Sequence, residues 1–218
     1  LTLGLFLGSW WAYTILGWGG YWAWDPVENS ALMPWLIMTA FVHSIMVQKR
    51  RGMFRMWNII LITLAFTMAQ MGMFINRGGP VPSVHSFAQS TMGWLFLFFM
   101  AFTLLGSLLA FAWRMDKLKS RGTLESIFSR EGIFLTQNVL FIVVALVTLW
   151  GTIYPVISQA FTGTTVTVGE PFFNRVNGPL LLIIVLLMGI GPLIPWRKTR
   201  VRTVIYALRF PVTFSILI

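Results

Sequence analysis

The residues with the clearest chemical potential form one short stretch, GWGGYWAWDPVENS, which runs from Gly17 to Ser30. It gathers four large aromatic residues among three glycines and then two carboxylates. Glycine lets a backbone turn tightly and lets a large group approach, and each well-placed aromatic pair adds about 0.5–1.5 kcal/mol of stacking. The pattern predicts a flat aromatic shelf for a planar apolar ligand with charged edges, a description that haem fits. The shelf residues are Trp18, Tyr21, Trp22 and Trp24.

The same stretch has a structural interpretation, which stays open at this point. Tryptophan and tyrosine collect at membrane interfaces because their rings are amphipathic, so a simple interfacial belt is the alternative to a shelf. Asp25, Pro26 and Glu28 suit the N-cap, first and third positions of a helix, which together form a capping box. The sequence therefore predicts a helix that starts sharply at Pro26.

The elements around this stretch are those of an integral membrane protein. Hydrophobic residues make up 57% of the chain and charged residues only 10%, and several apolar runs are long enough to cross a bilayer. We expect an all-α fold, a polytopic transmembrane helix bundle in a single domain over residues 1–218, with short outer loops. About seven spans are predicted, the first and last incomplete: 1–16, 29–48, 56–76, 94–113, 134–154, 180–194 and from 203 onward. Both ends are apolar, so we expect a piece of a longer membrane protein.

The charge distribution predicts how the bundle is oriented. The net charge is +10, and most lysines and arginines fall in three connections, 49–55, 114–130 and 197–202. The positive-inside rule places these connections on the cytoplasmic or equivalent side. The charge therefore indicates topology, and we expect no nucleic acid partner. The motif loop 17–30 and the histidine-bearing loop 77–92 are then predicted to lie outside.

The chain has two histidines, His43 and His85, and no cysteine, so thiolate chemistry and disulfides of its own are excluded. His43 lies inside the second span, where an ionisable side chain is costly and is a functional candidate; a neutral imidazole bonded to a backbone carbonyl is the alternative. His85 lies in an outer loop, where simple solvation is the alternative. His43 follows Asp25 by roughly 27 Å of helix, so one haem cannot serve both places.

Five stretches together resemble the tryptophan-rich (WWD) haem-handling membrane proteins, and within them the CcmF family of cytochrome c-type biogenesis proteins. They are GSWWAYTILGWGG, WGGYWAWDPVENSALMPWL, HSIMVQKRRGMFRMWN, SVHSFAQS and SREGIFLTQN. The resemblance implies that His43 is an axial ligand of a haem b buried in the bundle. It also implies that His85 ligates the iron of a second, transient haem beside the motif, with Trp18, Tyr21, Trp22, Trp24 and Asp25 around it. Arg77 is either an interfacial residue or a partner for a haem propionate.

The resemblance further implies a subunit of a cytochrome c haem lyase. Such a protein receives haem from the chaperone CcmE at the outer face and positions it for thioether attachment to an apocytochrome c, with a CcmH-type thiol-reducing partner. The family carries two further haem-ligating histidines that have no position here, so we expect the missing remainder of the same protein, or a partner, to supply them. The expected location is the bacterial cytoplasmic membrane, with the motif on the periplasmic side, or alternatively the mitochondrial inner membrane.

Two other functions stay open on the sequence. A haem exporter would need a polar path from the inner side, and the predicted spans hold few polar residues. A scaffold that only recruits the chaperone and the thiol-reducing partners would itself bind no haem. An absorption spectrum of the purified protein distinguishes the scaffold from the other two.

Overall fold

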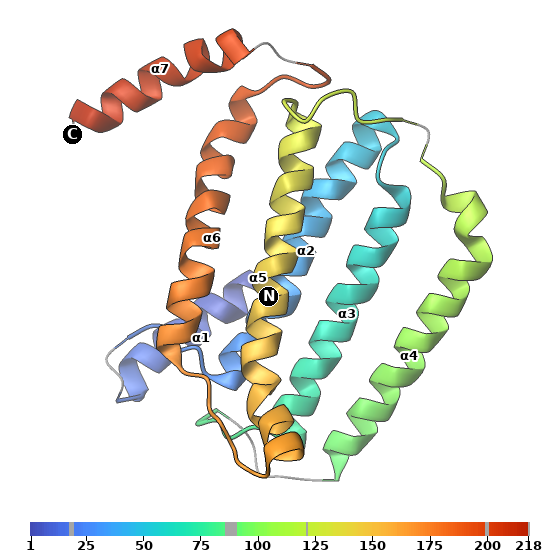
Figure 1. Cartoon of the computed structure of the whole chain (residues 1–218), viewed down its shortest axis with the longest axis vertical. Coiled ribbons are helices and arrows are strands. Elements are labelled where there is room, and N and C mark those ends of the chain that lie inside the picture. The colour runs from blue at the N-terminus through green and yellow to red at the C-terminus, as the bar shows by residue number, and fades with distance from the viewer. Residues whose placement is uncertain (18–19, 86–90, 121, 199–200, 218) are drawn as a thin grey trace.

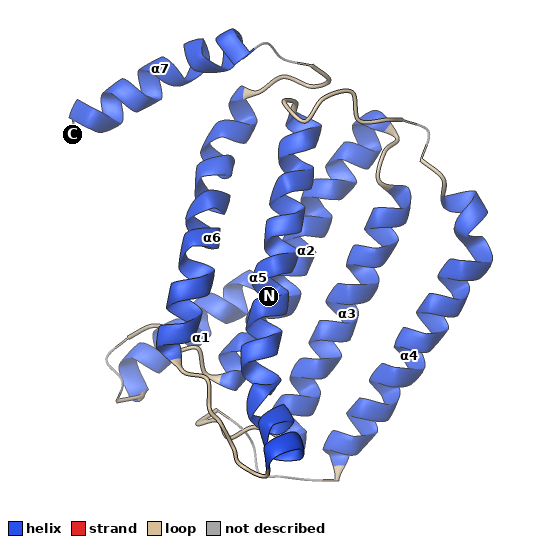
Figure 2. Ribbon diagram, viewed as in Figure 1, coloured by secondary structure: helices blue, strands red, loops and turns tan. Residues whose placement is uncertain are grey.

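The computed structural model describes residues 1–17, 20–85, 91–120, 122–198 and 201–217. Within these residues every regular element is a helix, as Figure 2 shows, which confirms the all-α prediction for the described part of the chain. The α-helices are α1 (Thr2–Ile15), α2 (Pro26–Arg51), α3 (Arg55–Gly78), α4 (Met92–Arg114), α5 (Arg130–Thr162), α6 (Glu170–Ile190) and α7 (Val201–Leu217). Two short 3-10 helices are η1 (Met115–Leu118) and η2 (Gly191–Leu193).

Five helices are long and apolar enough to cross a membrane: α2, α3, α4 continued by η1, α5, and α6 continued by η2. They have 24 to 33 residues, and the hydrocarbon core of a bilayer needs about 20 in a helix. The chain is therefore an integral membrane protein, as the composition predicted. The remaining helices α1 and α7 have 14 and 17 residues, so the first and last of the seven predicted spans stay predictions.

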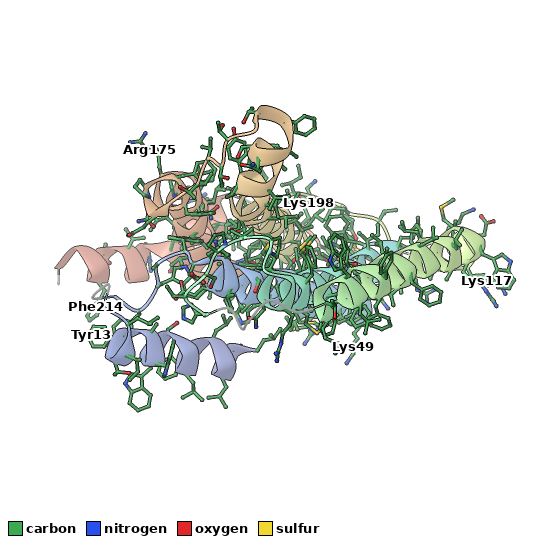
Figure 3. All side chains as sticks on the ribbon, turned by 90° about the horizontal axis from the view of Figure 1, so that it is seen from below. Tyr13, Lys49, Lys117, Arg175, Lys198 and Phe214 are labelled. Atoms are coloured by element: carbon green, nitrogen blue, oxygen red, sulfur yellow. The ribbon has the colours of Figure 1, made fainter. Side chains whose placement is uncertain are left out.

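The helix α2 lies at the centre of the bundle, between α3 and α5. The helix α4 packs on the far side of α3 and α6 packs on α5, so the five long helices lie side by side as antiparallel neighbours (Figure 1). Buried apolar side chains close the interfaces, among them Leu36, Ile37, Leu61, Val144 and Ile184. The short helix α1 lies alone on the side of α2 away from α5 and α6 (Figure 3).

The two ends of the bundle are chemically different. At one end, lowest in Figure 1, the motif residues 20–28 meet the ends of α3 and α5 and the start of α6; we call this the tryptophan end. At the opposite end, which we call the basic end, lie the segments 49–55, 114–120, 122–130 and 197–198. Which side of a membrane each end faces stays a prediction.

A buried carboxylate ties three segments together at the basic end. Glu131, at the start of α5, is 1% exposed and lies 2.9 Å from Nε of Arg51. It also accepts hydrogen bonds from the backbone N–H of Arg197 at 2.9 and 3.1 Å. Because a buried carboxylate needs such partners, these contacts fix the end of α2 against the start of α5 and the segment after η2.

Candidate functional site

The tryptophan end is organised by the N-terminus of α2. Oδ1 of Asp25 accepts a hydrogen bond from the backbone N–H of Val27 at 3.0 Å. Oε2 of Glu28 accepts from the backbone N–H groups of Asp25 at 3.2 Å and Ala23 at 3.0 Å. The predicted capping box, with Pro26 in the first helical turn, is therefore confirmed. It fixes where α2 begins and holds the end of the motif against it.

The same oxygen of Asp25 orients His85, which lies 60 residues further along the chain. Nδ1 of His85 is 3.2 Å from Oδ1 of Asp25. Ser83 bridges the pair, because its hydroxyl donates to Asp25 at 2.5 Å and accepts from the backbone N–H of His85 at 3.0 Å. A carboxylate only accepts hydrogen bonds, so Nδ1 carries the proton and Nε2 keeps its lone pair. A carboxylate behind an imidazole is typical of histidines that ligate a metal.

His85 lines a cavity of about 260 Å³ between α1 and the start of α2, which we call the histidine cavity. Trp11 and Trp22 also line it, and the ring centroid of Trp11 lies 5.4 Å from that of His85. Gly4 and Gly8 contribute to its α1 wall, and an added Cβ at either position would meet no atom within 4 Å. A neighbouring cavity of about 580 Å³ is lined by Phe6, Ser9, Trp10 and Tyr21. The two share Ser9, and concave, mainly apolar surfaces of this kind are where small ligands and cofactors bind.

The aromatic residues of the motif take up different positions. Trp22 lines the histidine cavity, while Tyr21 stacks on Tyr13 of α1 with ring centroids 4.3 Å apart. Trp24 stands at 89° to Trp22 and is not among the described residues that line the cavity. Trp18 lies outside the described residues. The motif therefore does not present Trp22 and Trp24 as one flat surface.

Trp24 braces the motif against α6. Its ring stacks on Phe173, with centroids 5.1 Å apart and planes 12° apart, and its Nε1 donates to Oδ1 of Asn174 at 2.8 Å. Its φ of 57° is unusual for a bulky residue, and the amide of Asn29 donates to its carbonyl oxygen at 2.8 Å. Phe173 is buried against Gly151, where an added Cβ would lie 2.6 Å from the phenyl ring. A haem contact for Trp24 stays a prediction.

Arg77 lies in the last turn of α3, at the tryptophan end, and its side chain is exposed. It is not among the described residues that line the histidine cavity. After Arg77 the chain turns at Gly79, whose φ is 61°, and continues to Ser83 and His85. The structure thus brings His85 to the motif, whereas a propionate contact for Arg77 stays a prediction.

His43 lies in the half of α2 nearer the basic end. Its Nδ1 is 2.8 Å from the carbonyl oxygen of Thr39, so Nδ1 donates and Nε2 again keeps its lone pair. The imidazole lies against two rings of α5, with centroids 5.3 Å from Phe134 and 6.3 Å from Phe141. Since α2 is one continuous helix from Pro26 to Arg51, His43 belongs to a different site from His85, as predicted.

Both histidines have the chemistry of an iron porphyrin ligand, because in each imidazole an acceptor fixes Nδ1 as the protonated nitrogen. Sequence reasoning assigned no role in the site to one residue that lines the histidine cavity and to two residues that support the site. These are Trp11, Ser83 and Asn174. The tandem tryptophans of GSWWAY signalled Trp11, whereas nothing local in the sequence marks Ser83 or Asn174.

The N-terminal part of this sequence matches a model of a known protein family. The first 79 residues, which include α1, the motif, α2 and α3, match the family described as cytochrome C assembly protein. The part of the chain that contains the motif and His43 is therefore similar to cytochrome c assembly proteins.

Individual proteins and one solved structure show similarity over nearly the whole chain. The chain is 43% identical over 205 residues to the cytochrome c-type biogenesis protein CcmF of Escherichia coli, covering 94% of this chain and 32% of that protein. It is 40% identical to the CcmF of Haemophilus influenzae, covering 100% of this chain and 33% of that protein. A solved structure of the cytochrome c haem lyase CcmF matches with a TM-score of 0.72 and 38% identity, over 100% of this chain and 33% of that one. The chain is thus similar to CcmF proteins over 94% to 100% of its length, and it spans about a third of the length of these relatives.

Proposed function

We propose that this chain is the haem-binding part of a cytochrome c haem lyase. Its tryptophan end would receive haem from a CcmE-type chaperone and present it to an apocytochrome c, on the periplasmic side of a bacterial cytoplasmic membrane. The observation that supports this best is the Asp25–His85 pair at an indole-lined cavity. A solvated loop histidine needs neither a carboxylate behind it nor two tryptophans beside it, whereas a haem iron ligand is well served by both.

The proposed task of the tryptophan end is positioning. Nε2 of His85 would hold the iron, Trp11 and Trp22 would line the porphyrin, and the open α1 wall would leave an edge free for the incoming polypeptide. In thioether attachment a cysteine thiol of the apocytochrome adds across a haem vinyl group, so sulfur bonds to one vinyl carbon and the proton ends on the other. Because this chain has no cysteine, no thiol of its own competes. Fixing two reactants in register lowers a barrier by several kcal/mol.

We assign His43 to a second haem, of b type, within the bundle. The Thr39 carbonyl fixes Nδ1, and Phe134 and Phe141 give the imidazole an apolar environment. A bound haem b would supply one-electron redox chemistry at this depth. A second protein ligand for each iron would come from residues outside this chain, which spans about a third of the length of its relatives.

Haem content of the complete protein tests both assignments. The protein is purified in detergent from cells that produce the chaperone, and haem is measured by absorption and by pyridine haemochrome. We expect His43→Ala to lose the haem b that co-purifies, and His85→Ala to retain it but to lose the haem trapped from the chaperone. Met46→Ala and Val84→Ala are matched controls, because both are exposed neighbours of the histidines and should change neither. Full retention of both haems in the histidine variants contradicts the proposal, and a wild type free of haem favours a scaffold.

A further inference from the structure

At the basic end, two arginine side chains lie against the ring of one tryptophan. The guanidinium carbon of Arg50 lies 5.4 Å from the ring centroid of Trp196, and that of Arg130 lies 5.3 Å from the same centroid. Arg130 is further fixed by hydrogen bonds to the carbonyl oxygens of Ile194 at 2.8 Å and Pro192 at 2.7 Å. Two guanidinium groups of like charge are thus held near one indole, from the end of α2 and the start of α5.

The charges of these two arginines are not balanced by the carboxylates of this end. Glu125 and Glu131 both pair with Arg51, and Asp116 pairs with Lys119 at 3.0 Å. The acidic residues of the basic end are Asp116, Glu125 and Glu131. Among the described residues, no carboxylate forms an ion pair with Arg50 or Arg130. Carbonyl oxygens satisfy N–H groups but carry no net charge. The arginine cluster, which consists of Arg50 and Arg130 beside Trp196, therefore favours the binding of an anion that these carboxylates do not supply.

Aromatic contacts connect this cluster to His43. Trp196 meets Phe134 edge to face, with centroids 6.2 Å apart, and Phe134 lies 5.3 Å from the ring of His43. Arg50 follows His43 by two helical turns on the same face of α2, about 10 Å nearer the basic end, and Arg130 precedes Phe134 by about one turn. Both guanidinium groups therefore lie on the histidine side of the bundle and beyond His43 toward the basic end.

We propose that Arg50 and Arg130, held on Trp196, bind the two propionate carboxylates of the haem whose iron His43 ligates. This inference rests on the proposed haem b at His43. Guanidinium matches carboxylate in a bidentate manner, and contact of its face with an aromatic ring leaves its N–H groups available at the edge. The porphyrin would then have one orientation, with its propionate edge toward the basic end and its opposite edge toward the tryptophan end.

The test compares two ligands that differ only at the carboxylates. Haem-depleted complete protein, carrying His85→Ala so that the outer site is silent, is titrated with haem and with haem dimethyl ester, and affinity is read from the Soret band. Arg50→Gln is the main variant because Arg50 makes no hydrogen bond to a described residue that would be lost with it. Lys49→Gln removes a neighbouring exposed cation and is the matched control.

We expect Arg50→Gln to lower haem affinity about tenfold and to leave affinity for the ester within about twofold, as for loss of one charge-assisted bond. Arg130→Gln should act in the same direction and Arg130→Lys less strongly, while Lys49→Gln should change neither ligand. Equal losses for haem and ester, or no loss for haem, overturn the propionate assignment. Loss of co-purifying phospholipid without loss of haem affinity also overturns it and assigns the cluster to a lipid phosphate. If His43→Ala leaves both affinities unchanged, the haem b site itself is wrong, whatever the arginine variants do.

Discussion

The two histidines are held in opposite ways, although in both of them Nδ1 is the nitrogen that an acceptor fixes. His43 takes its acceptor from its own helix, a carbonyl four residues earlier, and packs against rings of the neighbouring α5. His85 takes its acceptor from a carboxylate 60 residues away and is joined there by Trp11 of α1. A carboxylate behind an imidazole raises its basicity as a ligand more than a carbonyl does. Under the proposed function, this difference would suit a permanently built site at His43 and an assembled, adjustable site at His85.

The surroundings of the two sites agree with this difference. The helices around His43 share a continuous apolar core. The histidine cavity instead depends on α1, of which only Ala12 is buried among the described residues, and which is joined to α2 by the hydrogen bond from Nε1 of Trp35 to the hydroxyl of Thr2 at 2.9 Å. Regions with few buried contacts open most easily. A haem that must arrive and leave is better served by such a site than by the core.

Among the variants that should separate the two histidine sites, we expect Asp25→Asn to have the largest effect on haem affinity. Asparagine is also a good N-cap, so α2 should keep its start, while the negative charge behind His85 is lost. Affinity of the histidine cavity for haem should fall about 10–100-fold, with no change at His43. Soret titration of the complete protein measures both sites, the outer site in a His43→Ala background and the inner one in a His85→Ala background.

Two controls sharpen this result. Thr39→Val leaves the backbone carbonyl behind His43 in place and should not alter haem binding there. A melting temperature within about 2 °C of the wild type shows that the cap survives in Asp25→Asn, since loss of a cap costs about 1 kcal/mol. If Asp25→Asn melts early and binds haem normally, Asp25 is a helix cap and nothing more.

What the sequence predicted well was local. The apolar runs predicted the five long helices, and DPVE predicted the capping box at the start of α2. Both depend on residues within a few positions of one another, where periodicity and capping chemistry decide the structure. The separation of His43 from Asp25 also followed from helical rise alone, because Asp25 caps the uninterrupted helix on which His43 lies.

What the sequence could not predict depends on contacts between distant segments. Nothing near position 24 indicates that its indole turns to Asn174, 150 residues later, instead of joining Trp22. The bond of Asp25 to His85 is of the same kind, because a capping residue gives no local sign of a second partner. The family resemblance supplied the two histidines as ligands, but the supporting residues emerge only when the helices are packed.

We expect Trp22→Ala to have a smaller effect on haem affinity, again at the histidine cavity only. Trp22 lines the histidine cavity and precedes the start of α2, whereas His43 lies in the second half of that helix. Loss of Trp22 should therefore remove one stacking surface from the outer site only. One ring pair contributes about 0.5–1.5 kcal/mol, which corresponds to a two- to tenfold loss of haem affinity there. Trp94→Ala is the matched control, because Trp94 is 62% exposed on α4 and should change neither site. An equal loss at His43 would show that Trp22 acts on the bundle as a whole.

The smallest effect is expected from Asn174→Leu, which keeps the size of the side chain and removes the acceptor of the Trp24 indole. The variant also loses the exposed hydrogen bond from Asn174 to Glu170. Loss of the bond to Trp24 costs about 1 kcal/mol, and the stacking on Phe173 remains. We therefore expect a loss of less than about fivefold in haem affinity at the histidine cavity, a shift of tryptophan fluorescence, and no change at His43. Arg175→Ala changes the adjacent exposed residue of α6 and should leave all three unchanged. If the fluorescence shifts while outer affinity is untouched, Trp24 braces the loop without helping the site, and the adjustable site consists of His85, Asp25, Trp11 and Trp22 alone.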